Sequence, residues 1–407
     1  MRLWRRYKQT SFIIKMTTAF LLGIFAGILF RQQTTILEPL GTLLIHLLSL
    51  IAIPVIFLTV ILAVNKMNMT QLGRMGGKLI LYYIATTACA VLIGLGLALW
   101  INPGENLSLP DTTVEKPETP SFSDIILQIV PENIFSAFTS GNLMAILFIA
   151  VIIGIAISTM RHASDKKMIE YGNLLNTFFT ALNEMFYKIL QGVLLYAPIG
   201  IFAISATAFG SQGLATFQSL LTFTLVFYAG IALLWLVVYT AFLKFSNTPV
   251  LAFFKQTKEA YTTAFFTSSS IAALPIAIRS AKKAGISETT ANFALPLGAV
   301  FNSDGGALRM GVSLVFAANI TNLSLSPLDF LSIVVIGTLL SIGTAGVPAA
   351  GLVTLSAVLS MFGLPLEIVA LIAGVDALIG MAGTASNVMG DIVGAAVVDK
   401  SERKRAA

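Results

Sequence analysis

Long apolar runs separated by short polar turns dominate the first 248 residues. They cover residues 11–30, 37–64, 78–101, 124–159, 174–209 and 217–245. A helix needs about 20 apolar residues to cross a bilayer, so each run predicts a membrane span. The first run is longer than the apolar core of a typical signal peptide, which favours a retained span.

After residue 245 the segments become shorter and richer in Gly, Ser and Ala. They cover residues 249–281, 289–318, 328–362 and 366–398. The first has Ser268, Ser269 and Ser270 before Pro275, and the third has several glycines around Pro348. Non-helical backbone persists at membrane depth only where protein buries it or water reaches it. We therefore expect 249–281 and 328–362 to be re-entrant hairpins with polar tips.

The predicted fold is an all-α polytopic membrane protein with eight transmembrane helices and two re-entrant helical hairpins. Composition agrees, because 56% of the residues are hydrophobic and 11% are charged, whereas soluble domains have about 25% charged residues. The net charge of +6 is interpreted as basic cytoplasmic loops rather than as a nucleic-acid surface. The chain has no phosphate-binding GxxxxGK[ST] loop, which argues against ATP-driven transport.

The distribution of basic residues predicts the orientation in the membrane. If the N-terminus is cytoplasmic and both hairpins return to the side they left, twenty of the 25 Lys and Arg residues are cytoplasmic. Only Arg31 and Lys116 then lie outside. Cytoplasmic loops are enriched in Lys and Arg. The expected location is the plasma membrane, with both termini in the cytoplasm.

Polar residues inside the last spans carry the candidate chemistry. Asp304, Asp376 and Asp391 lie in apolar surroundings, where each ionised carboxylate costs about 2.5–3.5 kcal/mol. Their oxygen-rich neighbours suit an alkali or hard divalent cation. Asn387 and Asp391 share one helix face. Two glycines after Asp304 are expected to loosen the helix there. The alternative is an interhelical polar clamp with no ion.

The chain resembles the dicarboxylate/amino acid:cation symporter family, which includes the glutamate transporters. The resemblance runs nearly end to end and depends on the order of its motifs. They are Ile53-Pro54-Val55-Ile56-Phe57, Tyr82-Tyr83 with Thr86-Thr87, Tyr196-Ala197-Pro198-Ile199-Gly200, Ser268-Ser269-Ser270, Leu295-Pro296-Leu297-Gly298-Ala299, Asn302-Ser303-Asp304-Gly305, Gly343-Thr344-Ala345-Gly346-Val347-Pro348, and Asn387 with Gly390-Asp391.

The resemblance implies an elevator-type transporter with inverted repeats, assembled as a homotrimer. Residues 1–248 would form mainly the scaffold and trimer contacts, with the third span also contributing to the cation site. Residues 249–407 would form the transport core.

The resemblance also implies co-transported sodium ions and no organic cofactor. One implied sodium site contains Asp391, Asn302 and the carbonyls of Gly298 and Asn387. A second contains Tyr83, Thr86, Thr87, Asn302 and Asp304. A third contains the backbone carbonyls of Val300, Ser341, Ile342 and Thr344 and is closed by the second hairpin. Ser303 stands where the family usually has methionine.

Substrate positions carry over with departures. Those that match the family are Ser269, Ser270, Val347, Gly351, Thr384 and Asn387. Gly383 replaces the arginine that binds a side-chain carboxylate in glutamate transporters, Gly380 replaces the aspartate that binds the amino group, and Gly306 replaces a threonine. These glycines predict a wider pocket.

Arg309 lies three residues after Gly306, where the family usually has an aromatic residue. We hypothesise that Arg309 supplies a relocated positive charge that faces either Asp376 or a substrate carboxylate. A purely structural Arg309–Asp376 pair is the equal alternative.

The sequence thus predicts a symporter, not an enzyme, that couples sodium or proton influx to uptake of a dicarboxylate or amino acid. The missing amino-group aspartate favours dicarboxylates, and a neutral amino acid in a widened pocket is the alternative. Two further alternatives are a substrate-gated ion channel and an intramembrane hydrolase using Ser269 with Asp304 or Asp376.

Overall fold

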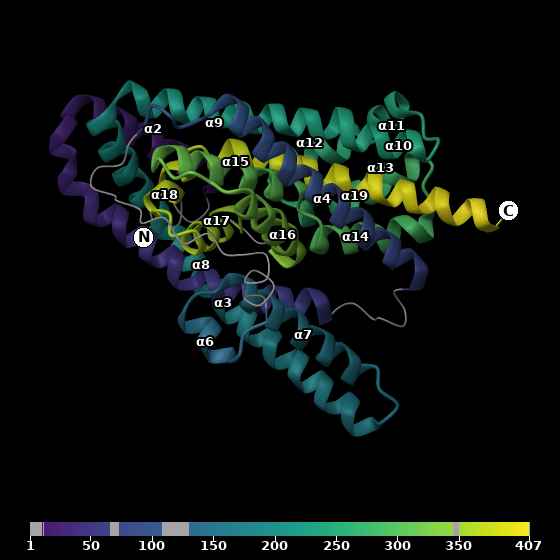
Figure 1. Cartoon of the computed structure of the whole chain (residues 1–407). Coiled ribbons are helices and arrows are strands. Elements are labelled where there is room, and N and C mark those ends of the chain that lie inside the picture. The colour runs from purple at the N-terminus through teal and green to yellow at the C-terminus, as the bar shows by residue number, and fades with distance from the viewer. Residues whose placement is uncertain (1–9, 11, 66–72, 108–129, 345–349, 407) are drawn as a thin grey trace.

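A computed structural model describes residues 10, 12–65, 73–107, 130–344 and 350–406. Every regular element in these ranges is helical (Figure 1). The elements are α2 (Phe12–Phe30), the 3₁₀ helix η1 (Arg31–Leu37), α3 (Glu38–Asn65), α4 (Gly73–Ile101), α6 (Ile134–Thr139), α7 (Leu143–Arg161), α8 (Lys166–Gln212), α9 (Leu214–Leu233), the π-helix η2 (Leu234–Tyr239), α10 (Thr240–Phe245), α11 (Val250–Gln256), α12 (Lys258–Thr267), α13 (Ser270–Lys283), α14 (Glu288–Phe301), α15 (Asp304–Ile320), α16 (Pro327–Thr344), α17 (Ala350–Met361), α18 (Glu367–Ala373) and α19 (Asp376–Ala406).

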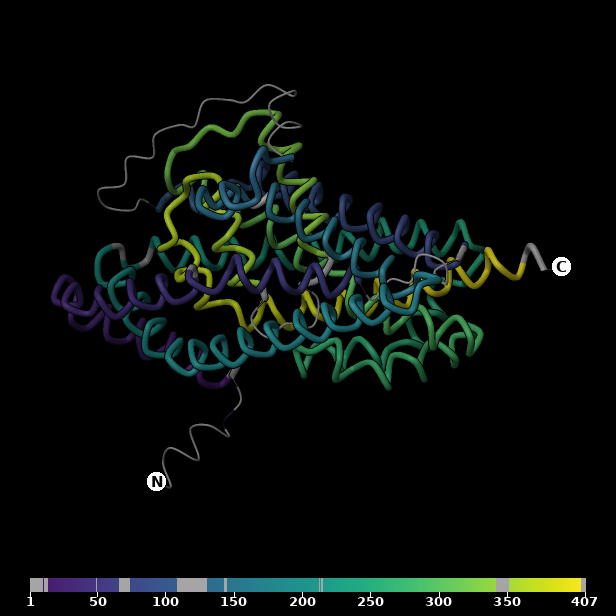
Figure 2. Tube along the Cα trace, turned by 90° about the horizontal axis from the view of Figure 1, so that it is seen from below, coloured from purple at the N-terminus to yellow at the C-terminus, as the bar shows by residue number. Residues whose placement is uncertain are grey.

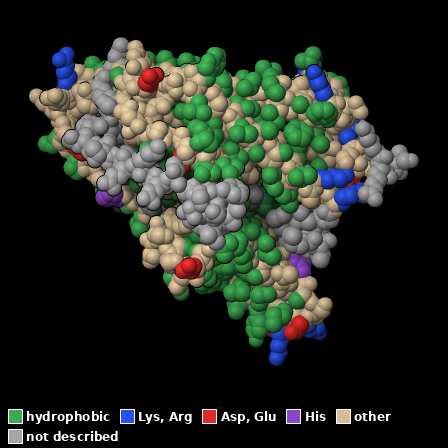
Figure 3. All heavy atoms as spheres, in the orientation of Figure 1, with side chains coloured by type: hydrophobic (Ala, Val, Ile, Leu, Met, Phe, Trp, Pro, Cys, Tyr) green, Lys and Arg blue, Asp and Glu red, His purple; other side chains and the backbone are tan. Residues whose placement is uncertain are grey.

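Five segments among the described residues are long and apolar enough to cross a membrane by length and composition. Hydrophobic side chains cover a broad area in the middle of the face shown in Figure 3, and many of the charged side chains lie toward its edges. Side chains such as Phe25, Leu81 and Leu236 are more than two-thirds exposed in the chain taken alone. An apolar exterior of this kind matches lipid rather than water as the solvent.

The long helix α8 organises one part of the molecule, in which it packs along α2, α3 and α7. Glycines allow the close approach. A Cβ on Gly27 would lie 2.7 Å from the carbonyl oxygen of Ala206, and one on Gly154 would lie 2.9 Å from that of Ile61. Small residues commonly mediate such backbone contacts between membrane helices.

The second part of the molecule surrounds α15 and α19. Helix α4 packs along α15, and α9 contacts both α4 and α15. A Cβ on Gly311 would lie 2.6 Å from the Val91 carbonyl oxygen, and one on Gly94 would overlap the Leu308 carbonyl oxygen. The backbones of α4 and α15 therefore touch, which fixes the position of α4 relative to the start of α15.

The first predicted hairpin is confirmed. Helices α12 and α13 are joined at Ser268, which adopts a left-handed conformation with φ +48°, and the two helices pack against each other. Ser269 caps α13 by accepting a hydrogen bond from the Ala272 amide at 3.2 Å. In the second predicted hairpin, α16 ends at Thr344 and α17 begins at Ala350, and its expected tip lies outside the described residues.

The single span predicted over residues 124–159 is wrong in its described part. Asn133 and Asn142 cap two separate helices, α6 and α7, by accepting hydrogen bonds from the amides of Phe135 and Ala145. An asparagine cap satisfies amides that a new helix leaves unpaired. These caps separate α6 from α7, which extends to Arg161.

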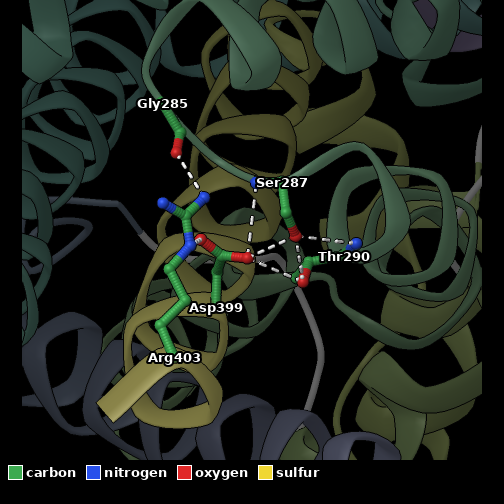
Figure 4. Close-up of polar contacts among 5 residues, drawn as sticks. All are labelled: Gly285, Ser287, Thr290, Asp399 and Arg403. Carbon is green, nitrogen blue, oxygen red and sulfur yellow. Dashed lines mark hydrogen bonds and ion pairs between the residues drawn. The ribbon is translucent and has the colours of Figure 1, made fainter. Parts of the chain in front are cut away.

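Polar contacts tie the last turns of α19 to the α13–α14 turn (Figure 4). Buried Asp399 accepts hydrogen bonds from the hydroxyls of Ser287 and Thr290, at 2.5 and 2.8 Å, and pairs with Arg403 at 2.8 Å. Arg403 also donates to the Gly285 carbonyl at 2.8 Å. These contacts place the base of the first hairpin beside the C-terminal end of α19. Figure 2 shows the hairpin helices and this end of α19 on the same side of the molecule.

Candidate functional site

Asp304 is the centre of a buried polar cluster between α4, α15 and the end of η2. The hydroxyls of Thr86 and Thr87 donate to its Oδ1 at 3.1 and 2.9 Å. Tyr239 donates to its Oδ2 at 2.8 Å. Asp304, Thr86, Thr87 and Tyr239 are completely buried. Three hydroxyl donors lower the cost of a buried carboxylate, and no basic side chain hydrogen-bonds to it among the described residues.

Asn302 joins this cluster to Asp391. Its Nδ2 donates to Asp391 Oδ1 at 3.0 Å and to the Asn387 carbonyl at 3.3 Å. Its Oδ1 is buried and has no hydrogen-bond partner among the described residues. An unsatisfied buried carbonyl oxygen is unusual in proteins. It is also the kind of hard oxygen ligand that an alkali cation takes.

Gly298 and Tyr83 complete the surroundings of Asp391. A Cβ on Gly298 would lie 2.5 Å from the Asp391 carboxylate and 2.6 Å from the Tyr83 hydroxyl, so only glycine leaves room there. The Tyr83 hydroxyl donates to the Ala294 carbonyl at 3.4 Å. The residues implied for the first two sodium sites therefore lie in one continuous cluster.

The helix break that opens this cluster lies before Asp304, not after it. Helix α14 ends at Phe301 and α15 begins at Asp304, so Asn302 and Ser303 form the break. The expectation that Gly305 and Gly306 loosen the helix is wrong, because both are helical. The Gly305 amide donates to Asn387 Oδ1 at 2.8 Å, since the first amides of a helix have no partner within it.

The third implied sodium set is only partly described. Ser341 Oγ lies 3.5 Å from Thr87 Oγ1, so the end of α16 reaches the cluster. A small pocket is lined there by Tyr83, Phe301, Thr338 and Ser341, among others. Ile342 and Thr344 lie in the last turn of α16, and the contribution of their carbonyls and that of Val300 stays a prediction.

Arg309 and Asp376 form a buried ion pair on the side of Asp304 toward the start of α19. Arg309 Nη1 contacts Asp376 Oδ1, and the two side chains are 6% and 11% exposed. A Cβ on Gly351 of α17 would overlap the guanidinium. The pair therefore lies where α15, α17 and the start of α19 meet.

The three replaced pocket residues do not behave alike. A Cβ on Gly380 would meet no atom within 4 Å, whereas one on Gly306 would lie 2.5 Å from Ser303 Oγ. A Cβ on Gly383 would lie 3.6 Å from the Phe227 ring, and Gly383 is itself crossed closely by Gly305. Space for a Cβ is therefore open at Gly380, ordinary at Gly383 and tight at Gly306, and the wider pocket stays a prediction.

The other predicted substrate residues are dispersed. Ser269 and buried Ser270 lie at the tip of the first hairpin, and no hydrogen bond among the described residues joins them to the Asp304 cluster. Thr384 is half-buried on α19. Val347 lies outside the described residues.

Two residues of the cluster were missed by the sequence analysis. Tyr239 donates to Asp304, and it also donates to the Ser386 carbonyl at 3.1 Å. Trp235 Nε1 donates to Ser386 Oγ at 3.0 Å. The available signal was a tyrosine and a tryptophan four residues apart in an otherwise apolar run, which places both on one helix face.

Apolar helices long enough to cross a bilayer, with neutral oxygens around two buried carboxylates, define a membrane protein with a polar site in its interior. A family model described as the sodium:dicarboxylate symporter family matches residues 12–401. The chain belongs to this family, as the motifs predicted, and not to a family of enzymes.

Named relatives agree. A C4-dicarboxylate transport protein of Deinococcus deserti is 32% identical over 404 residues, which cover 97% of this chain and 90% of the relative. A protein of the same description from Burkholderia mallei is 29% identical over 402 residues, with 96% and 92% covered. Another from Burkholderia pseudomallei is 29% identical over 402 residues.

Proposed function

We propose that this protein is a secondary symporter that couples sodium influx to uptake of a C4-dicarboxylate across the plasma membrane. The unpartnered Asn302 Oδ1 between Asp304 and Asp391 carries the proposal. Two buried carboxylates linked by an amide need positive charge nearby, and the surrounding ligands are oxygens, which suit sodium. The names of the relatives supply the solute.

Binding of sodium and solute is coupled in this proposal because the two share residues. The backbone carbonyl of Asn387 accepts a hydrogen bond from Asn302 Nδ2, and its side-chain Oδ1 accepts one from the Gly305 backbone amide. It stands one turn from Thr384 and two turns from Gly380 on the same face of α19. A cation bound at Asn302 and Asp391 thus orders the helix face on which the solute lies.

The proposed movement is of the elevator type. The packing of α2, α3, α7 and α8 on one another supports a scaffold, and the packing of α4 and α9 around α15 supports a core that carries the cluster. The homotrimer and the cytoplasmic termini are part of the same proposal.

The test is transport by the purified protein in liposomes. Radiolabelled succinate should accumulate when an inward sodium gradient is imposed, and not with potassium alone. Asn302→Ala removes a proposed sodium ligand and Asp391→Asn removes the negative charge of another, so each should lower the initial rate at least tenfold. Ser136→Ala, at an exposed position of α6, is the matched control and should transport normally.

The alternatives give different results. Succinate accumulation driven by a proton gradient without sodium would show that the coupling ion is a proton. Uptake of neutral amino acids in place of succinate would support the second solute class. Sodium conductance that does not require solute would indicate a channel and contradict symport.

A further inference from the structure

Arg309 is buried with only part of its hydrogen-bonding capacity used. The residue is 5% exposed, and its Nη1 contacts Asp376. Nε and Nη2 are both buried and have no hydrogen-bond partner among the described residues. The Nε–H and one Nη2–H of a guanidinium point the same way, and this edge matches the two oxygens of a carboxylate.

Ser313 adds a third unpartnered group on the same side of α15. It lies one turn after Arg309, so the two residues share a helix face. Its side chain is fully buried, and its Oγ has no hydrogen-bond partner among the described residues. Other buried serines in this part of the protein bond to their own helix, as Ser356 does to the Val353 carbonyl at 2.8 Å.

The second hairpin covers this place. Gly351 of α17 packs so closely on the guanidinium that a Cβ there would overlap Nη1. Asp376, at the start of α19, contacts this same Nη1. The guanidinium is therefore fixed in orientation, and its Nε–Nη2 edge is the part left to bind another group.

We propose that the Nε–Nη2 edge of Arg309, together with the Ser313 hydroxyl, is the subsite for one carboxylate of the transported anion. Asp376 stays on Nη1 during binding and acts as a positioning residue. This inference rests on the proposed function for the carboxylate nature of the solute. It adds the binding mode, the role of Ser313 and the separate role of Asp376.

The test measures succinate affinity of the full-length protein in sodium buffer by isothermal titration calorimetry. Arg309→Lys keeps the positive charge but loses the planar edge, and should weaken affinity about thirtyfold or more. Ser313→Ala should weaken it about tenfold, because a hydrogen bond to a charged group is lost. Ser356→Ala is the matched control and should bind as the wild type does.

Sodium binding separates failure of this inference from failure of the proposed function. Sodium alone should raise the thermal unfolding temperature of the wild type and of Arg309→Lys equally. No effect of sodium on the wild type would contradict the proposed function. Wild-type succinate affinity in Arg309→Lys, or in Ser313→Ala, would overturn the subsite.

Asp376→Asn tests the positioning role. The amide keeps an oxygen for Nη1 but removes a negative charge near the bound carboxylate, so succinate should bind several-fold more tightly. A merely structural pair would give no gain. Loss of succinate binding would overturn retention of Asp376 on Nη1. Loss confined to amino acids would assign Asp376 to an ammonium group and overturn the proposed mode.

Discussion

Gly390 lies on α19 against three atoms of the Asp304 cluster. A Cβ there would lie 2.7 Å from the Tyr239 hydroxyl, 2.8 Å from Asn302 Nδ2 and 2.9 Å from Asp304 Oδ2. Real Cβ atoms essentially never come this close to another heavy atom. The absence of a side chain at this position is thus a requirement of the cluster.

Gly390→Ala should therefore displace the ligands while leaving every polar group present. We expect the sodium-dependent rise in unfolding temperature, measured without solute, to fall to less than half that of the wild type. Gly77→Ala is the control, since a Cβ there meets no atom within 4 Å. An undiminished response in Gly390→Ala would show that the cluster is not the sodium site.

The α4–α15 crossing shows the same constraint for whole elements. Gly94 and Gly311 bring the two backbones into contact. This contact sets the distance at which Thr86 and Thr87 meet Asp304. Packing between helices thus determines the geometry of the cluster.

Gly94→Ala should separate these helices. Overpacking costs about 1–3 kcal/mol, so the variant should unfold at a lower temperature in detergent and bind sodium more weakly. Gly96→Ala, two residues along the same helix, meets no atom within 4 Å and should be neutral or slightly stabilising. Equal unfolding temperatures for the two variants would contradict the close crossing.

Helical elements were predictable where apolar runs were long, and less so where polar residues interrupt them. The runs at 37–64 and 78–101 closely match α3 and α4. Asp304 and Asp391 could be identified because carboxylates stand out in apolar sequence. Asn302 was identified from the order of the motifs. Tyr239 was missed since a tyrosine in an apolar run signals packing as readily as hydrogen bonding. The roles of Gly305 and Gly383 depend on which helices cross, which a single sequence does not encode locally.

In the molecule as a whole, ion pairs bring the ends of several helices together on one side. Arg74 and Lys78 at the start of α4 both pair with Glu402 near the end of α19. The α13–α14 turn joins the same end through Asp399. The excess of Lys and Arg on this side predicts that it faces the cytoplasm.

Cysteine labelling in intact cells tests this orientation. In a Cys89→Ser background, Glu105→Cys should react with a membrane-impermeant maleimide, because this exposed residue follows α4 on the opposite side. Ser164→Cys, exposed in the α7–α8 turn, should react only after the membrane is permeabilised. The reverse pattern would invert the predicted topology.

The polar contact between α4 and Asp304 joins residues 217 positions apart in the chain. At about 5–20 residues per second of translation, α4 waits roughly 10–40 s in the membrane before Asp304 is made. Before Asp304 is made, the Thr86 hydroxyl still has a partner, because it also bonds to the Tyr83 carbonyl of its own helix at 3.3 Å. The costly carboxylates are synthesised last, when the hydroxyls that receive them are already inserted.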